Sequence, residues 1–345
     1  MQFISKTIGL LNYKFSTFWI IFKWLIFCTV IYFLYSVIRN RQVDIGYVIY
    51  HLNRVLSVRN IFFFLIVFLL SFLNWSLEAK KWQILVNQVE IVSFKDAFKS
   101  VLIGLSFGFI SQADLGDLAG KMVLIKNENR KKSTGAVLLG GGIQTYISLI
   151  FGTFGLTYFM INVFSSISTF EFAILNLCFL GIFSGIVLLY YRKNINFVFD
   201  NFSFLAYLKP FLIILESYSN LEIIQVFTLS VSRYLIFSLQ FLIILFIFQI
   251  DLPILVLMMI IFLVFLVKTI VPSVSFLSDL GIRSMTSLYL FEFYKIKSSI
   301  VIASTFTIWF INILLPVIIG TFVFLRLKKT QKKNQLRMFE IDFIC

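Results

Sequence analysis

The chain has 345 residues, of which 60% are hydrophobic, 18% are aromatic and only 13% are charged. A soluble domain carries about 25% charged residues and cannot bury this much apolar surface. The net charge of +14 would suit a nucleic-acid-binding protein, but basic residues are concentrated beside apolar runs, at 121–132 and 326–337, as is typical of segments that flank a membrane. The composition predicts one polytopic membrane domain over residues 1–345, with no nucleic-acid partner.

Six apolar runs are long enough to cross roughly 30 Å of hydrocarbon as helices. They cover about residues 16–38, 60–79, 134–162, 170–191, 223–249 and 298–325. No small-residue cleavage site follows the first run, so we expect a retained helix and not a signal peptide. The sequence predicts an all-α integral membrane protein with about six transmembrane helices.

Two other apolar stretches are too short or too interrupted to span the bilayer. Residues 94–111 lead into the polar, glycine-bearing segment "ADLGDLAGK" at 113–121. Residues 252–297 have an apolar arm to Ile270, a break at 271–283, and a return arm. This pattern suits a helical hairpin that enters the membrane and turns back, so we predict two re-entrant hairpins.

The two hairpins share a short recurrence. Asp-Leu-Gly is found at 114–116 and at 279–281, and each copy is followed by a cation, Lys121 or Arg283. One hairpin is predicted to enter from the cytoplasm and the other from outside, which is the arrangement of inverted-repeat transporters. We therefore expect an inverted repeat whose two polar segments meet near the middle of the bundle.

Four residues are expected to form structural turns in the hairpins: Gly116, Gly120, Gly281 and Pro272. Glycine allows the chain to turn and allows a neighbouring helix to approach closely, and proline ends a helix. The recurrence of glycine, which includes Gly104 and Gly108, is also explained by helix packing alone. Gln144, in the following span, is a candidate polar lining residue.

Charged side chains within a membrane cost about 2.5 kcal/mol or more each, and therefore indicate functional sites. The candidates for a lipid headgroup cavity are Asp114, Asp117, Lys121, Arg233, Asp279 and Arg283. Asp117 could instead cap a helix, and Lys121 could reach the headgroup layer. Arg233 needs a phosphate or a carboxylate, and the alternative to a cavity role is a structural pair with a carboxylate such as Glu78 or Asp279.

The segment "NWSLEAKKW" at 74–82 has the composition of a helix end at the membrane surface. Trp75 and Trp82 would belong to an aromatic belt, and Lys80 and Lys81 would flank it on the cytoplasmic side. We therefore interpret this segment as interfacial.

The distribution of Lys and Arg predicts an inner (cytoplasmic) membrane protein with both termini in the cytoplasm. The segments 79–133 and 192–222 and the tail 326–345 are basic, whereas the loops 163–169 and 250–251 contain no Lys or Arg. Residues 39–59 contradict this pattern, because they place four arginines outside. We expect an interfacial helix in that region.

Catalytic and metal-binding motifs are missing from the sequence. There is no phosphate-binding loop, G-x-S-x-G, H-E-x-x-H or dinucleotide-binding glycine pattern, and the one histidine, His51, argues against His-based acyl or phosphoryl transfer. Cys28, Cys178 and Cys345 lie far apart, which argues against disulfide, zinc or thiol chemistry. We expect no cofactor, no metal and no enzymatic activity.

Three groups of short motifs in this sequence resemble motifs in the membrane portion of a known family. They are "NWSLEAKKW" (74–82), "GLSFGFISQADLGDLAGK" (104–121) with "GGIQTYISLIFG" (141–152), and "VPSVSFLSDLGIRS" (271–284) with "TIWFINILLPVIIG" (307–320). Together they resemble the flippase-like membrane domain of lysylphosphatidylglycerol synthases over about residues 60–325. The family motifs correspond here to Gln112, Gly116, Asp117, Gly120 and Lys121, and to Pro272, Asp279, Gly281, Arg283, Trp309, Asn312 and Pro316. Gln112 replaces the usual proline.

The resemblance implies lipid handling. Full-length synthases add a soluble aminoacyl-transferase domain that these 345 residues do not contain, so we expect a stand-alone member that does not aminoacylate lipid. The predicted function is translocation of a phospholipid, polyprenyl-linked or glycolipid headgroup through a polar cavity, with anionic lipids or glycolipids as partners. The alternative is a non-transporting scaffold that docks a lipid-modifying enzyme or glycosyltransferase through its basic segments.

Overall fold

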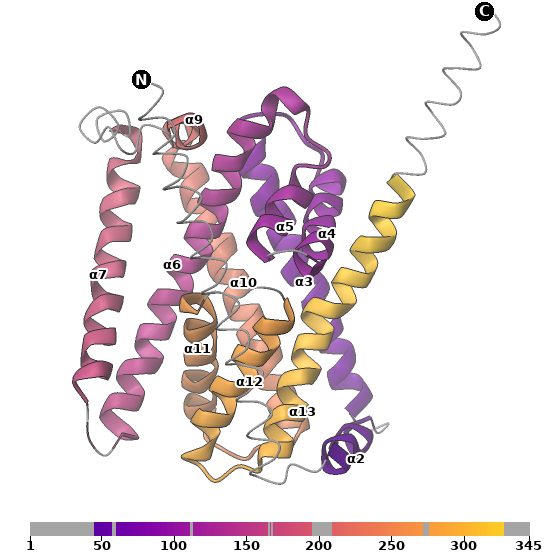
Figure 1. The fold of residues 1–345 in the computed structure, drawn as a ribbon, viewed down its shortest axis with the longest axis vertical. Helices are drawn as coiled ribbons and strands as arrows, with labels where there is room; N and C mark the ends of the chain where they lie inside the picture. Colours follow the sequence, from indigo (N-terminus) through magenta and orange to yellow (C-terminus); the bar gives the residue numbers. More distant parts are fainter. Residues whose placement is uncertain are drawn as a thin grey trace, which may run out of the picture.

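The structure, a computed structural model, describes residues 45–56, 60–110, 113–164, 166, 168–194, 209–271 and 276–327. Every regular element in these ranges is helical. The main helices are α2 (Ile45–Val55), α3 (Ile61–Val86), α4 (Phe94–Ile110), α5 (Ala113–Lys121), α6 (Arg130–Asn162), α7 (Thr169–Tyr191), α10 (Asn220–Ile247), α11 (Ile254–Ile270), α12 (Phe276–Glu292) and α13 (Ser298–Trp309) (Figure 1). The short elements are η2 (Asn127–Asn129), η3 (Arg192–Asn194), α9 (Lys209–Leu212), η5 (Ile213–Ser217) and the π-helical turn η6 (Phe310–Leu314).

Five helices are long and apolar enough to cross a membrane. They are Ile61–Val86, Arg130–Asn162, Thr169–Asn194, Asn220–Ile247 and Ser298–Leu327, the last being α13 with its continuation through η6. They coincide with five of the six predicted spans, and the sixth, 16–38, lies outside the described residues. The described part of the chain is all-helical, and its long apolar helices are those of a multi-pass membrane protein.

The outer surface of the bundle is apolar, as expected for contact with lipid. In α7, only 6% of the most apolar 18-residue window is buried, and large side chains such as Phe172, Leu180 and Leu188 are exposed. A contiguous apolar surface of this length would aggregate in water, but in a bilayer it is solvated by acyl chains.

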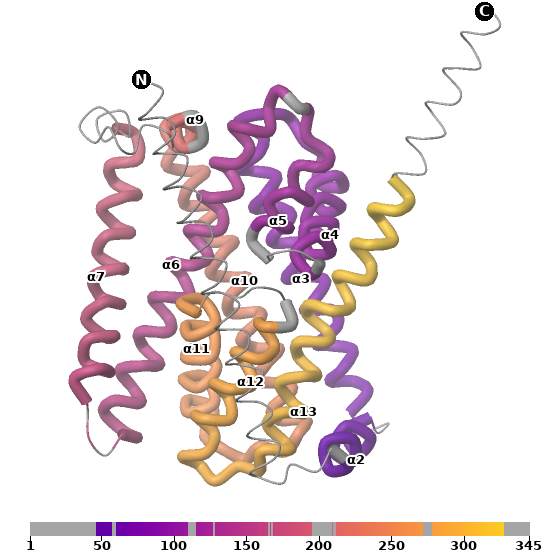
Figure 2. Tube along the Cα trace, in the orientation of Figure 1, coloured from indigo at the N-terminus to yellow at the C-terminus, as the bar shows by residue number. Residues whose placement is uncertain are grey.

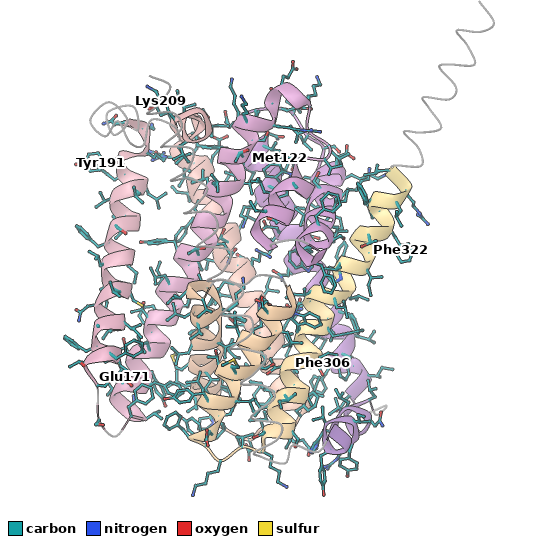
Figure 3. All side chains as sticks on the ribbon, viewed as in Figure 1. Met122, Glu171, Tyr191, Lys209, Phe306 and Phe322 are labelled. Carbon is teal, nitrogen blue, oxygen red and sulfur yellow. The ribbon has the colours of Figure 1, made fainter. Side chains whose placement is uncertain are left out.

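The long helices connect two ends of the molecule. One end, which we call the α9 end, is formed by α9 with residues 87–93 and 122–129; the opposite end, the α2 end, is formed by α2 with residues 248–253 and 293–297 (Figure 1). Met122, Tyr191 and Lys209 lie at the α9 end, whereas Glu171 lies at the α2 end (Figure 3).

This arrangement groups the loops in part as the charge pattern requires, because the α2 end also carries Arg54, Lys295 and Lys297. The described parts of the basic segments 79–133 and 192–222 reach the α9 end, where the final helix also ends at Leu327. The described parts of the loops around Ser166 and Asp251, which contain no Lys or Arg, lie at the α2 end. The helix predicted within 39–59 is present as α2.

Two helical hairpins lie within the bundle. α4 packs against α5, and α11 packs against α12. The α4–α5 hairpin extends from the α9 end and the α11–α12 hairpin extends from the α2 end, so that their inner ends face each other at mid-height, where α12 contacts α4 (Figure 2). The two hairpins therefore have opposite directions, and their inner ends meet.

Glycine brings the backbones of α4 and α5 into contact. A Cβ atom added to Gly116 would lie 2.2 Å from the backbone nitrogen of Gly108, and one added to Gly120 would lie 2.3 Å from Cα of Gly104. No side chain fits at such distances. The turn role assigned to Gly116, Gly120 and Gly281 is a misassignment, because all three lie inside helices, α5 or α12. The packing interpretation explains Gly116 and Gly120.

Candidate functional site

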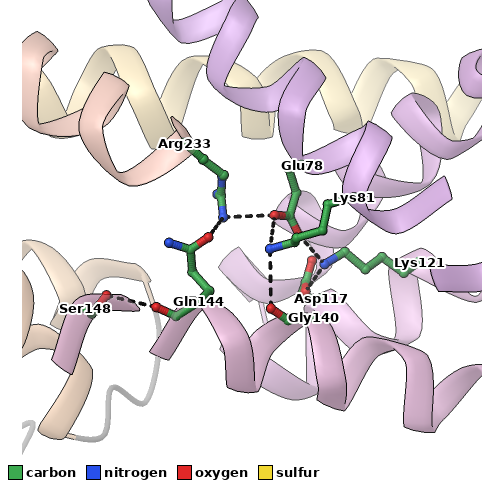
Figure 4. Close-up of polar contacts among 8 residues, drawn as sticks. All are labelled: Glu78, Lys81, Asp117, Lys121, Gly140, Gln144, Ser148 and Arg233. Atoms are coloured by element: carbon green, nitrogen blue, oxygen red, sulfur yellow. Dashed lines mark hydrogen bonds and ion pairs between the residues drawn. The ribbon is translucent and has the colours of Figure 1, made fainter. Parts of the chain in front are cut away.

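A cluster of charged side chains lies in the interior where α3, α5, α6 and α10 meet (Figure 4). We call it the Glu78 cluster; its members are Glu78, Lys81, Asp117, Lys121 and Arg233. Oε2 of Glu78 lies 2.6 Å from Nζ of Lys81 and 2.9 Å from Nη1 of Arg233. Nζ of Lys121 donates to Oε1 of Glu78 at 2.9 Å and to Oδ2 of Asp117 at 2.8 Å. One carboxylate thus binds cations from three helices.

Helical spacing places these groups together. Glu78 and Lys81 are three residues apart on α3, and Asp117 and Lys121 are four residues apart on α5, so each pair shares one helix face. Arg233 comes from the middle of α10, far from either helix end. The carboxylate of Glu78 is the shared partner that fixes α5 and α10 against α3.

Neutral groups complete the surroundings of the cations. The guanidinium of Arg233 lies 4.8 Å above the ring of Trp75, and its Nη1 donates to Oε1 of Gln144 at 3.4 Å. Nζ of Lys81 donates to the carbonyl oxygen of Gly140 at 3.4 Å. Gln144, predicted as a polar lining residue, therefore contacts the cluster directly.

The cluster carries an excess of positive charge and is accessible on one side. Its three cations face two carboxylates, which leaves one positive charge. The side chains of Glu78 and Lys121 are 7% and 8% exposed, whereas those of Arg233 and Asp117 are 18% and 31% exposed. A buried cation needs a hydrogen-bonded anion, so the arrangement favours an anionic group that approaches from the side of Asp117 and Arg233.

The interfacial interpretation of "NWSLEAKKW" is wrong. Lys81 and Trp82 are each only 2% exposed, and Lys80 alone of the two lysines faces outward. The reason is that α3 does not end near residue 79 but continues to Val86, and Glu78 neutralises Lys81 inside the bundle. Glu78 and Lys81 are the site residues that the sequence reasoning missed. The available signal was the spacing of Glu78, Lys81 and Trp82, which places an acid, a base and an aromatic ring on one helix face.

A second buried ion pair lies on the other hairpin. Nε of Arg283 donates to Oδ2 of Asp279 at 2.8 Å, and Nζ of Lys268 lies 3.9 Å from Oδ1 of Asp279. The guanidinium of Arg283 lies 5.1 Å from the ring centre of Phe237 and 5.4 Å from that of Phe265. We call Asp279 and Arg283 the Asp279 pair. Within the described ranges, no ion pair links it to the Glu78 cluster.

The six predicted site residues are thus divided. Asp117, Lys121 and Arg233 belong to the Glu78 cluster, and Asp279 and Arg283 form the Asp279 pair. Asp114 lies in the first turn of α5. The structure bears on two sequence-based alternatives: Lys121 is buried against Glu78 and Asp117, and the carboxylate partner of Arg233 is Glu78. Pro272 and Gln112, which the resemblance also assigns, lie outside the described residues.

The last long helix contributes backbone acceptors to α3. At η6 the helix adopts a π turn, which displaces carbonyl groups from their regular partners. Nε1 of Trp75 donates to the carbonyl of Asn312 at 3.1 Å, and Oγ of Ser71 donates to that of Ile311 at 3.4 Å. The π turn thereby fixes Trp75, whose ring lies under Arg233.

Two pockets lie apart from these charges. One, of about 610 Å³, lies at the α2 end between α2, α3, α10 and α13. The other, of about 340 Å³, lies between α4 and the continuation of α13 and is almost entirely apolar. Asp117, Lys121, Arg233, Asp279 and Arg283 line neither of them.

Comparison with known proteins adds no relative. No protein-family model matches the chain, and neither the curated proteins nor the solved structures give a significant match. The resemblance to the membrane domain of lysylphosphatidylglycerol synthases therefore stays a prediction.

Proposed function

We propose that the protein moves the polar headgroup of a membrane lipid across the bilayer, and that the Glu78 cluster binds the phosphate of that headgroup in transit. The observation that carries this proposal is the excess positive charge of the cluster among apolar, span-length helices. Such charges are costly in a membrane, and they are kept where a substrate needs them. The proposed membership of the lysylphosphatidylglycerol synthase membrane-domain family agrees with this function.

The exchange of partners at Lys121 supplies a mechanism. Lys121 is bound to Asp117, whose side chain is the most exposed in the cluster. An entering phosphate replaces the carboxylate of Asp117 on Lys121 and contacts Arg233, while Glu78 keeps the cations in place. When Asp117 binds Lys121 again, the phosphate is released, so that the headgroup does not remain trapped by a buried charge.

The two hairpins suggest how the proposed pathway is oriented in the membrane. We propose that α4–α5 and α11–α12 are re-entrant, that they form an inverted repeat, that the α9 end faces the cytoplasm, and that both termini are cytoplasmic. The support for the orientation is the basic character of the α9 end, which includes Lys126, Arg130 and Lys131. The support for the repeat is the opposite direction of the two hairpins and the contact between α12 and α4.

The test is lipid translocation by the purified protein in vesicles that contain fluorescent phosphatidylglycerol. Lys121→Gln removes the excess charge together with the bonds of Lys121 to Glu78 and Asp117, so some stability is lost and translocation is compared below the melting temperature of the variant. Glu78 stays paired with Lys81 and Arg233. The translocation rate should fall about tenfold or more, because a charge-assisted hydrogen bond contributes about 1.5–3 kcal/mol. Lys99→Gln is the matched control, since Lys99 forms a partly exposed pair with Asp96, away from the Glu78 cluster.

Either of two outcomes would refute the proposal. If folded Lys121→Gln protein is destabilised but translocates at the wild-type rate, the Glu78 cluster is structural. If the wild-type protein does not translocate phosphatidylglycerol or other phospholipid probes above empty vesicles, the scaffold alternative takes precedence.

A further inference from the structure

The pocket at the α2 end lies apart from the Glu78 cluster. Its volume of about 610 Å³ lies within the range of roughly 300–1,000 Å³ that is usual for ligand sites. Its lining includes the polar groups of His51, Arg54, Asn60 and Gln249. It also includes apolar side chains, among them Phe63 and Phe246, which are both 47% exposed. The pocket therefore combines polar groups with exposed apolar side chains.

The polar lining residues of the pocket are suited to an anion. Arg54 supplies a permanent charge, Asn60 and Gln249 supply amide N–H donors, and no carboxylate is found among the described lining residues. Asn60 is already oriented, because its Nδ2 donates to the carbonyl oxygen of Val55 at 3.1 Å. A guanidinium with adjacent amide donors is the arrangement that binds phosphate oxygens.

We propose that this pocket binds the phosphate of an anionic amphiphile, with the phosphate at Arg54, Asn60 and Gln249 and the hydrocarbon portion against Phe63 and Phe246. The pocket is separate from the Glu78 cluster and lies at the end of the molecule opposite to the basic α9 end. The inference does not depend on translocation, because binding at the α2 end and movement past the Glu78 cluster can be lost independently.

The end of α10 places Gln249 at the pocket. Gln249 has a φ of 57°, the left-handed conformation in which the chain leaves the helix: the N–H of Ile250 donates to the carbonyl oxygen of Leu245 at 3.1 Å, and the N–H of Gln249 donates to that of Phe246 at 2.9 Å. Glycine is the usual residue at this position, so Gln249→Gly keeps the helix end and removes only the exposed amide from the pocket.

His51 makes the binding dependent on pH. Partial burial, followed by the charges of Arg54 on the same helix and Lys297 before α13, lowers the pKa of His51 below its usual value of 6.5. The imidazole is therefore neutral at pH 7 and gains a proton only as the pH falls below that value. Affinity for an anion should then increase, because His51 adds a second positive charge to that of Arg54 in the described lining of the pocket.

The test uses the full chain in phosphatidylcholine nanodiscs, with and without phosphatidylglycerol, and measures the melting temperature. Phosphatidylglycerol should raise it, because a ligand that binds only the folded state stabilises that state. Arg54→Gln should lose most of this rise, with affinity about tenfold or more weaker. Lys131→Gln, which removes the same charge from the exposed surface of the α9 end, should keep it. Gln249→Gly should melt no lower than the wild type but show a smaller rise.

The remaining measurements distinguish a lipid phosphate from free phosphate and show whether the proposal holds. An Arg54-dependent rise with inorganic phosphate alone would support the anion site and assign it to a soluble ligand. A rise that grows on acidification in the wild type but not in His51→Gln would support the role of the histidine. The proposal is overturned if neither probe raises the melting temperature, or if Arg54→Gln and the wild type respond equally.

Discussion

The two hairpins use the same local pair of charges in different ways. On α5, Asp117 binds Lys121 at 2.8 Å, and on α12, Asp279 binds Arg283 at 2.8 Å, each over four residues. The first pair is joined through Glu78 to α3 and α10. The second pair stays within its hairpin and is covered by aromatic rings from α10 and α11. The α4–α5 hairpin therefore forms ion pairs that reach the rest of the bundle, whereas, among the described residues, the ion pairs of the α11–α12 hairpin join only residues of that hairpin.

The comparison also corrects the register of the proposed repeat. The shared tripeptide aligns Asp114 with Asp279, but the residue on α5 that pairs with a cation four positions later is Asp117. Asp-Leu-Gly lies on the two helices that each carry such a pair, but its aspartate on α5 is three residues, about one helical turn, before the paired one. If the hairpins are related by a pseudo-two-fold axis, the pairs and not the tripeptides are the equivalent positions.

The largest effect is expected at Glu78, because it links three helices. Glu78→Gln removes the shared carboxylate and leaves Lys81, Lys121 and Arg233 close together with Asp117 as the only acid. Uncompensated buried charges of this kind cost about 3–5 kcal/mol, so the free energy of unfolding should fall by that amount. The measurement is denaturant or thermal unfolding of the purified protein in detergent.

Glu128→Gln is the control for this change. Glu128 is exposed at the α9 end, so the same chemical substitution should alter stability by less than about 0.5 kcal/mol. Equal stability of Glu78→Gln and Glu128→Gln would show that the cations of the cluster do not need the carboxylate of Glu78 for neutralisation. The coupling between the α4–α5 hairpin and the bundle would then not be electrostatic.

Hydropathy and charge predicted the helices of the membrane portion well but not the centre of the site. Five spans followed from apolar runs, because lipid requires long apolar helices whatever the tertiary contacts are. Lys80 and Lys81 ended the apolar run near residue 79, although α3 continues to Val86. The sequence alone does not distinguish a lysine that is neutralised inside a bundle from one that flanks a membrane. Only the partner on another helix, Lys121 or Arg233, shows that Glu78 is internal.

A smaller effect is expected at the Asp279 pair. Asp279→Asn leaves Arg283 without its carboxylate, but the guanidinium keeps the faces of Phe237 and Phe265, and the side chain of Lys268 is 38% exposed and can be solvated. The loss should be about 1.5–3 kcal/mol, as for a hydrogen bond to a charged group. Unfolding measured beside Glu78→Gln checks the order of the two effects. A larger loss for Asp279→Asn would reverse the comparison and make the α11–α12 hairpin the coupled one.

The smallest effect is expected from a change that keeps every charge. Gly104 on α4 faces Asp117, and an added Cβ atom would lie 2.6 Å from its Oδ1 and 3.0 Å from its carbonyl oxygen. Gly104→Ala must therefore displace α5 or rotate the carboxylate away from Lys121, at a cost of about 1–3 kcal/mol for overpacking. Gly141→Ala is the matched control, since an added Cβ atom there has no neighbour within 4 Å and should cost almost nothing.

Gly104→Ala separates geometry from charge in the Glu78 cluster. If Lys121 must exchange Asp117 for a phosphate, a displaced Asp117 should alter the translocation rate even in protein that remains folded, whereas Gly141→Ala should not. The same comparison made with phosphatidylglycerol binding at the α2 end should show no difference between the two variants, because α4 does not line that pocket. A Gly104→Ala protein that is destabilised but translocates at the wild-type rate would mean that the glycine contact serves packing alone, and that the position of Asp117 does not control the pathway.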